Sequence, residues 1–80
     1  MSPDKICADY AERGAKLTVE MLDGDTVLIK GNREALEFLA DLLRAQAHAA
    51  DDGFQISPNG AGSSLFASGS KYGLYVLRLE

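Results

Sequence analysis

The middle of the chain restricts the fold more than any other part, because residues 33–50 form one long segment rich in alanine and leucine. Apolar side chains recur at helical spacing and make one stripe: Leu36, Leu39, Ala40, Leu43 and Ala47, widened by Ala35, Phe38 and Leu42. Asn32 precedes the segment and is a favourable N-cap residue. The pattern predicts a helix over residues 33–50, with a stripe that needs a second layer to cover it.

Two short segments before this helix have the two-residue period of β-strands. Leu17, Val19 and Met21 alternate with polar residues, and Val27 and Ile29 alternate with Thr26 and Lys30. Asp23-Gly24 lies between the two segments and is a common hairpin turn. The sequence therefore predicts a β-hairpin in which Val27 and Ile29 lie on the inner, covered face and Leu28 lies on the outer face.

The chain after the helix contains a second pair of candidate strands. Residues 54–57 alternate and stop at Pro58, which cannot continue a central strand. Residues 59–70 are rich in Gly, Ser and Ala and predict a loop, in which we expect Leu65 and Phe66 to dock. Residues 72–79 are aromatic and apolar on both faces, which favours a central strand.

Together these segments predict an α+β fold of the order ββαββ. We expect one four-stranded, mainly antiparallel sheet with a single long helix on one face, in one domain over residues 1–80. Residues 16–80 would form the core, with the order of the strands left open. Residues 1–15 suit either a short helix, with Ser2 as N-cap and Pro3 in the first turn, or an extended arm.

Size and charge narrow the classes of ligand. The chain has 80 residues and a formal net charge of −4, so it would repel a nucleic-acid backbone or an anionic membrane surface. A domain of this size buries only about 60–65% of its unfolded surface, so association with a second copy would help stability. Cys7 is the only cysteine, and no secretory signal or apolar run of membrane-spanning length is present, which favours the cytoplasm.

Few residues suggest catalysis, metal binding or phosphate binding. His48 is the only histidine and lies on the polar side of the predicted helix, where a solvated imidazole is the simpler interpretation. His48, Asp51 and Asp52 offer metal-ligand atoms near the helix end, but Asp-Asp-Gly is also an ordinary helix-ending turn. Gly60 and Gly62 lie in a segment without the lysine and following helix of a phosphate-binding loop. We therefore expect no catalytic residue, no cofactor and no metal.

The distribution of charge is more informative than any motif. Residues 17–53 carry a net charge of −5, whereas the first 16 residues are neutral and the last 27 sum to +1. Glu34, Glu37 and Asp41 share one helical face, and Asp51 and Asp52 follow at the helix end. These five acids are either the solvated side of an amphipathic helix or a docking surface for a basic protein partner.

Two segments also carry a family resemblance. The stretch TVLIKGNREALEFLADLLRAQA of residues 26–47, with the closing GLYVLRLE, resembles the small α+β immunity proteins of bacterial polymorphic toxin systems, in the group numbered thirty-two. The resemblance implies a protein that binds and neutralises a cognate toxin without catalysis. The alternatives are a homodimeric structural or regulatory module and, third, a small-ligand protein or enzyme that uses His48.

Overall fold

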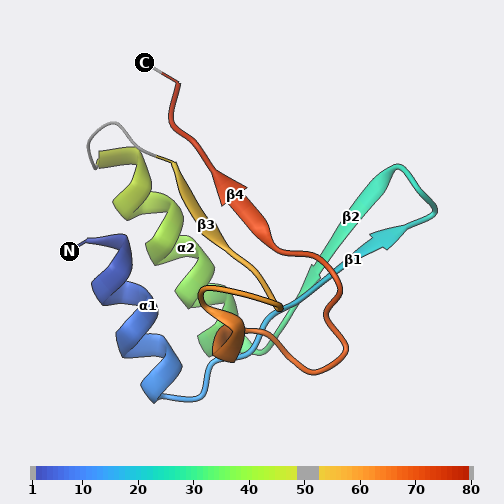
Figure 1. Cartoon of the computed structure of the whole chain (residues 1–80), viewed down its shortest axis with the longest axis horizontal. Helices are drawn as coiled ribbons and strands as arrows, with labels where there is room; N and C mark the ends of the chain where they lie inside the picture. The colour runs from blue at the N-terminus through green and yellow to red at the C-terminus, as the bar shows by residue number, and fades with distance from the viewer. Residues whose placement is uncertain (1, 49–52, 80) are drawn as a thin grey trace.

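The computed structural model describes residues 2–48 and 53–79, which form an α+β fold (Figure 1). The elements in chain order are α1 (Pro3–Glu12), β1 (Thr18–Leu22), β2 (Thr26–Lys30), α2 (Arg33–His48), β3 (Phe54–Ile56), the 3₁₀ helix η1 (Ser63–Leu65) and β4 (Leu74–Val76). The two α-helices lie side by side, and the two strand pairs extend from them in different directions.

The first residues form a helix rather than an extended arm. The Ser2 hydroxyl accepts a hydrogen bond from the Lys5 amide at 3.2 Å, and Pro3 occupies the first turn, where its missing amide leaves no helical bond unmade. Ile6 and Tyr10 are buried on the side of α1 that faces α2. Packing against α2 thus stabilises a helix that would be marginal in isolation.

The predicted hairpin is confirmed, but its predicted inner face is covered only at the base of the hairpin. β1 and β2 pair antiparallel, with Val19 opposite Ile29 and Met21 opposite Val27. The turn uses left-handed backbone at Asp23 and Gly24, with φ values of 60° and 83°. Of this face only Val19 is buried, because the hairpin projects away from the body, and Val27 is 55% exposed.

The prediction of one four-stranded sheet is wrong, because the structure has two separate two-stranded sheets. β3 pairs only with β4, antiparallel, and no strand among the described residues joins the two pairs. The reason is that residues 65–70 take the edge of β1: Leu17 donates to the Leu65 carbonyl at 2.8 Å and accepts from the Ala67 amide at 2.7 Å. The Val19 amide donates to the Ser70 hydroxyl at 2.9 Å.

The closing strand is an edge strand, which corrects its predicted central position. β4 has three residues, and Tyr75 is 64% exposed and Leu79 82% exposed. Leu74 and Val76 point the other way, with Ile56 and Phe54 opposite them, and are half-buried. Gly73 is required beside β3, because a Cβ there would fall 2.8 Å from the Ser57 Cα and closer still to the Ile56 carbonyl.

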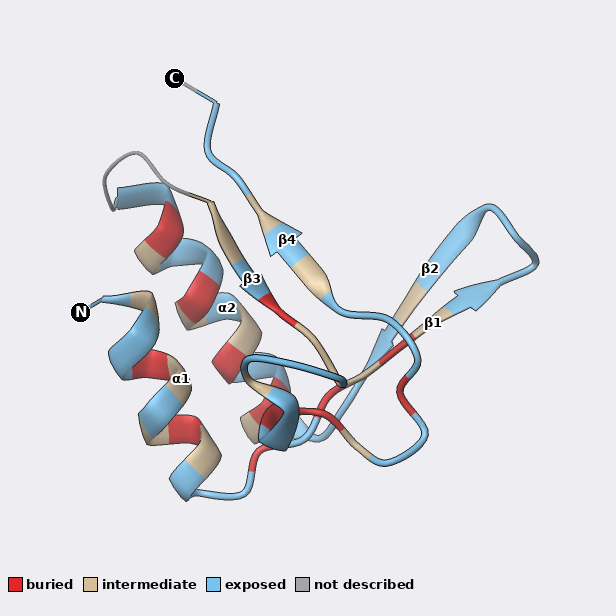
Figure 2. Ribbon diagram, in the orientation of Figure 1, coloured by how far each residue is buried: buried red, intermediate tan, exposed pale blue. Residues whose placement is uncertain are grey.

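The core lies where α1, α2, the base of the hairpin and η1 meet (Figure 2). Its largest fully buried side chains are Phe38, Leu17, Leu42, Ile56 and Leu65. The docking expected of Leu65 and Phe66 is confirmed. The predicted centre of the helical stripe is wrong, because Leu36 and Leu43 are exposed while the widening residues Ala35, Phe38 and Leu42 are buried.

Candidate functional site

An open groove runs between α1 and α2, with a volume of about 640 Å³. The helices are antiparallel, so the start of α1 lies beside the end of α2. The groove is lined by Ser2, Pro3, Ile6, Asp9, Tyr10, Arg13, Asp41, Arg44, Ala45 and His48. The groove therefore has a small apolar floor and walls that carry charged side chains of both signs. Its volume lies in the range that is usual for ligand pockets.

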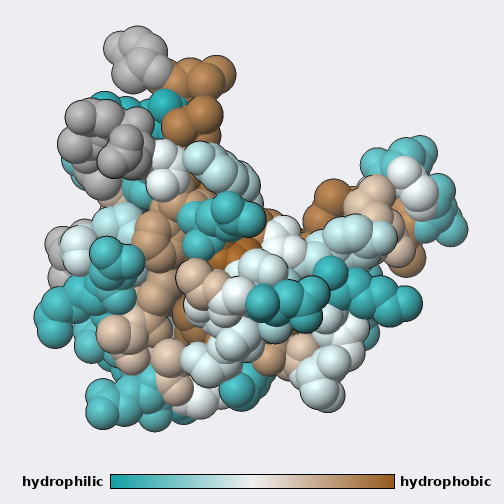
Figure 3. Space-filling model, viewed as in Figure 1, coloured by the Kyte–Doolittle hydropathy of each residue, from teal (hydrophilic) through white to brown (hydrophobic). Residues whose placement is uncertain are grey.

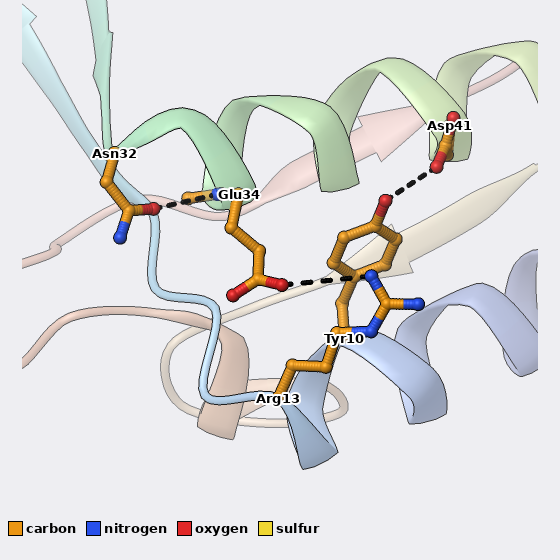
Figure 4. A network of polar contacts seen from close by, with 6 residues as sticks. Tyr10, Arg13, Asn32, Glu34 and Asp41 are labelled. Carbon is orange, nitrogen blue, oxygen red and sulfur yellow. Dashed lines mark hydrogen bonds and ion pairs between the residues drawn. The ribbon is translucent and has the colours of Figure 1, made fainter.

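Tyr10 joins the two helices (Figure 4). Its hydroxyl donates to Asp41 Oδ2 at 2.7 Å, and its ring is tilted against the Phe38 ring with centroids 5.5 Å apart. The Arg13 guanidinium lies 4.6 Å from the centre of the Tyr10 ring, a cation–π distance. One aromatic side chain thus contacts the core on one side and the charged groove on the other.

The hydrogen bond sets the protonation of both partners. It raises the pKa of Tyr10 above its ordinary value, with burial and the Asp41 charge acting in the same direction. The bond from Tyr10 also lowers the pKa of Asp41, and the hydrogen bond and positive charge of Arg44 lower it further against the opposing effect of burial. Asp41 is therefore a carboxylate, and Tyr10 a neutral phenol, at neutral pH.

Of the predicted acidic row of α2, which consists of Glu34, Glu37 and Asp41, only Asp41 lines this groove. Two members of the row have intramolecular partners. Glu34 lies 3.7 Å from the Arg13 guanidinium, as Figure 4 shows, and Asp41 accepts from Arg44 at 2.9 Å. Glu37 is exposed and has no ion pair with any residue that the structure describes. Asp51 and Asp52, the remaining predicted docking residues, lie outside the described residues.

The structure does not bring the other candidate residues together. His48 lies at the end of the groove, exposed, and within residues 2–48 and 53–79 no hydrogen bond joins it to a serine or to Cys7. Burial, and then the Asp4 carboxylate, raise the pKa of Cys7 to about 11, so this thiol is a poor nucleophile at neutral pH. The described part of the chain holds no group of three acids, histidines or cysteines that could bind a metal.

The glycine-rich segment beside Pro58 is closed by its own backbone. The Ser57 amide donates to the Ala61 carbonyl at 2.9 Å, and the Asn59 amide donates to the Ser57 hydroxyl at 3.2 Å. Gly62 has a left-handed φ of 78° and packs against Ile56. Because these amides have partners within the loop, they do not form an anion cradle.

Sequence reasoning missed Tyr10 and Arg13, which complete the groove opposite the acidic row. The signal was present: Ile6, Tyr10 and Arg13 fall on one face if residues 3–13 are helical. Tyr10 could be placed beside Ile6 on a helical face, but with an extended arm as the alternative neither Tyr10 nor Arg13 could be assigned to a groove. Ser70 was also missed, since nothing in a Gly/Ser-rich loop distinguishes the one hydroxyl that bonds a strand edge.

A second surface, made by the strands, is apolar and uncovered. Figure 3 shows brown, apolar side chains on the projecting hairpin and near the C-terminal end of the chain. We call Met21, Val27 and Ile29 the hairpin face, and Tyr75, Leu77 and Leu79 the C-terminal stripe; all six side chains are exposed. Scattered exposed apolar residues are normal, but contiguous groups on protruding elements are typical of interaction surfaces.

Two further observations concern the whole chain. None of the helices in the described residues is long and apolar enough to cross a membrane. Comparison of the sequence with protein-family models, and comparison of the chain with curated proteins and solved structures, finds no significant match.

Proposed function

We propose that the protein is a non-catalytic binding protein that neutralises a bacterial toxin in the cytoplasm, in the manner of an immunity protein. The resemblance carried by residues 26–47 and 73–80 suggests this class. The observation that carries the proposal is the groove between α1 and α2 together with the acidic row of α2, of which Asp41 lines the groove and Glu34 pairs with the lining residue Arg13. A concave surface with an apolar floor and charged walls suits an amphipathic segment of a protein partner.

The acidic row of α2 favours a basic partner for an electrostatic reason. Glu37 is free to pair with an incoming lysine or arginine, and Glu34 and Asp41 already hold cationic partners in ion pairs that are largely open to solvent. Exposed ion pairs contribute at most about 1 kcal/mol, so a basic side chain of the toxin can replace Arg13 or Arg44 at little cost. The net charge of −4 would also accelerate encounter with a basic toxin.

The test uses the toxin encoded by the gene adjacent to this one. We expect a complex of the two purified proteins, and we expect Glu37→Lys to weaken it by about twofold to tenfold, mainly through slower association. Glu12→Lys is the matched control, because it makes the same charge change at an exposed site of α1, away from the acidic row of α2. Surface plasmon resonance at two salt concentrations measures both effects.

Absence of a complex would reject toxin neutralisation. A complex that both variants weaken equally would reject the acidic row of α2 as its location, because total charge alone would then explain the effect. An inhibition assay of the toxin completes the comparison, since neutralisation requires loss of toxin activity at equimolar protein.

A second candidate function is a homodimeric structural or regulatory module. The observation that favours it is the uncovered apolar surface of the strands, which lies apart from the groove. The two functions are compatible, because a dimer built through the strands leaves the helical groove accessible.

A further inference from the structure

The hairpin face and the C-terminal stripe are two apolar surfaces of one chain that do not cover each other. Cross-strand partners point to the same side of a sheet, so Met21, Val27 and Ile29 continue the face that begins with buried Val19. Tyr75, Leu77 and Leu79 stand at alternate positions along the closing segment. The hairpin and β4 diverge from one region of the molecule (Figure 1), which keeps the two surfaces apart.

The exposed area of the chain is larger than its mass predicts. A compact monomer of 8.6 kDa exposes about 4,700 Å² by the usual scaling of area with mass. This chain exposes 5215 Å², and the residues of the two surfaces contribute to the difference. A standard protein interface removes about 800 Å² from each partner, so the excess of about 500 Å² is a substantial part of what one dimer interface would bury.

Each surface also ends in an unpaired strand edge. In the part of the chain that the structure describes, β4 pairs only with β3 and β2 pairs only with β1. The base of β1 is already bonded by Leu65, Ala67 and Ser70, so its outer edge is partly occupied. The outer edges of β2 and β4 remain available, and such edges readily accept a further strand.

The charges beside the two edges are opposite. Asp23 and Asp25 lie at the tip of the hairpin, and no described residue makes an ion pair with either of them. Lys71 precedes β4 and Arg78 follows it; Arg78 donates to the Ala47 carbonyl at 3.0 Å, and neither cation has an ion pair with a described carboxylate. Opposite charges favour a contact of hairpin with β4 over a contact of like with like.

We propose that two copies of this chain form a twofold dimer in which the hairpin face of each copy packs on the C-terminal stripe of the other, beside the open edges of β2 and β4. Each chain then donates one hairpin and accepts one, which closes the assembly after two copies. The hairpin face and the C-terminal stripe then cover each other, and the acidic tip of each hairpin meets Lys71 of the second copy. This inference develops the second candidate function and is independent of toxin binding.

The first test is the mass in solution. Sedimentation equilibrium at micromolar concentrations should give twice the 8.6 kDa chain mass. Val27→Asp and Leu77→Asp should each abolish the dimer, because a buried unpaired carboxylate strongly opposes association. Both positions are exposed in the single chain, so the folded monomer should persist, as circular dichroism would verify. Leu36→Asp is the matched control: it changes an exposed leucine of α2, outside the strands, and should leave the dimer intact.

The second test identifies the mode of contact. Asp25→Lys and Lys71→Glu should each raise the dissociation constant of the dimer by about twofold to fivefold, as exposed ion pairs do. The double variant should recover most of that loss, because the charges are exchanged rather than removed. A wild-type chain that stays monomeric would overturn the proposal. The proposal would also be overturned if the loss of dimer affinity in the double variant equalled the sum of the losses in the two single variants. Masses that keep rising above the dimer would overturn the closed twofold arrangement. The toxin-binding assay is separate, so failure of either proposal is recognised independently.

Discussion

Tyr10 is the residue at which core packing and groove electrostatics meet. Its ring contacts Phe38 at the centre of the core, and its hydroxyl fixes Asp41 on the opposite helix. Arg13 covers the ring from the solvent side and reaches Glu34. Replacement of this one side chain therefore tests whether the groove has a defined shape in the absence of a partner.

Tyr10→Phe should destabilise the fold only in a particular pH window. The folded-state pKa of Asp41 is lowered from 3.8, so its contribution is present above that value and is lost as the pH falls through the folded pKa. The folded-state pKa of Tyr10 is raised from 10.0, so its contribution is present below that value and is lost as the pH rises through the folded pKa. The wild type should therefore exceed the variant in stability from about pH 4 to about pH 10, with convergence outside these limits.

Urea denaturation across the pH range measures this difference. Tyr72→Phe is the matched control, because it removes the same atom from an exposed tyrosine whose hydroxyl makes no hydrogen bond with the described residues. Equal stability of wild type and Tyr10→Phe at pH 7 would contradict the role assigned to the Tyr10–Asp41 bond.

At the scale of elements, α2 is apolar over more of its circumference than the fold covers. Leu42 is fully buried beside Phe38, whereas its neighbour Leu43 is 45% exposed. The two leucines are adjacent in sequence and lie about 100° apart around the helix. They therefore lie in two different sectors of α2, one that faces the core and one that is exposed.

Alanine substitution of the two leucines should give unequal losses of stability. We expect Leu42→Ala to lower the free energy of unfolding by about 2–5 kcal/mol, because it leaves a cavity in the core. Leu43→Ala should cost less than about 1 kcal/mol, as is usual at the surface. Alanine is a good helix former, so neither substitution disturbs the helix itself. Chemical denaturation of the two variants under identical conditions measures the two losses. Similar losses at both positions would show that the exposed sector of α2 is covered in solution.

The same helix shows how far the sequence could predict the structure. Its start at the Asn32 cap and the hairpin before it were predictable, because caps and turns are local: Asn32 Oδ1 accepts from the Ala35 amide at 2.9 Å. The covered sector of α2 was not, since buried Ala35 and Phe38 interleave with exposed Leu36 and Leu43. That choice depends on the side from which α1 packs against α2, which no local pattern specifies.

The candidate site was likewise predictable only where the sequence signal was local. The acidic row Glu34, Glu37 and Asp41 could be placed on one helical face from spacing alone. Its partners Tyr10 and Arg13 could not be assigned, because they lie more than 20 residues earlier, on a helix whose formation depends on packing against α2. Local periodicity thus predicted the acidic face of α2 but not the α1 side of the groove.

At the scale of the whole molecule, the helices and the base of the strands share one core, whereas the far half of the hairpin stands outside it. From Met21 to Val27 every residue is exposed, and this part is held only by the pairing of β1 with β2. Isolated two-stranded hairpins are marginally stable in water. The hairpin should therefore open without unfolding of the core.

Amide hydrogen exchange measures that opening. In dilute protein the inter-strand amides between Met21 and Val27 should exchange on the order of a hundredfold faster than those of α2 around Leu42. Exchange in the hairpin should slow as the protein concentration rises, because the proposed dimer covers β2. Hairpin amides as slow as those of α2 in the dilute monomer would contradict a hairpin held only by its own pairing.

The bonds between Leu17 and residues 65 and 67 also set the order of events during synthesis. They join positions about 50 residues apart, so the hairpin base has these bonding partners only after more than four fifths of the chain has emerged from the ribosome. Until Ser70 is added, the amide of Val19 lacks its acceptor and Leu17 lacks its cover. Folding of this small chain is therefore completed late, and the nascent hairpin is a natural substrate for chaperones that recognise apolar segments.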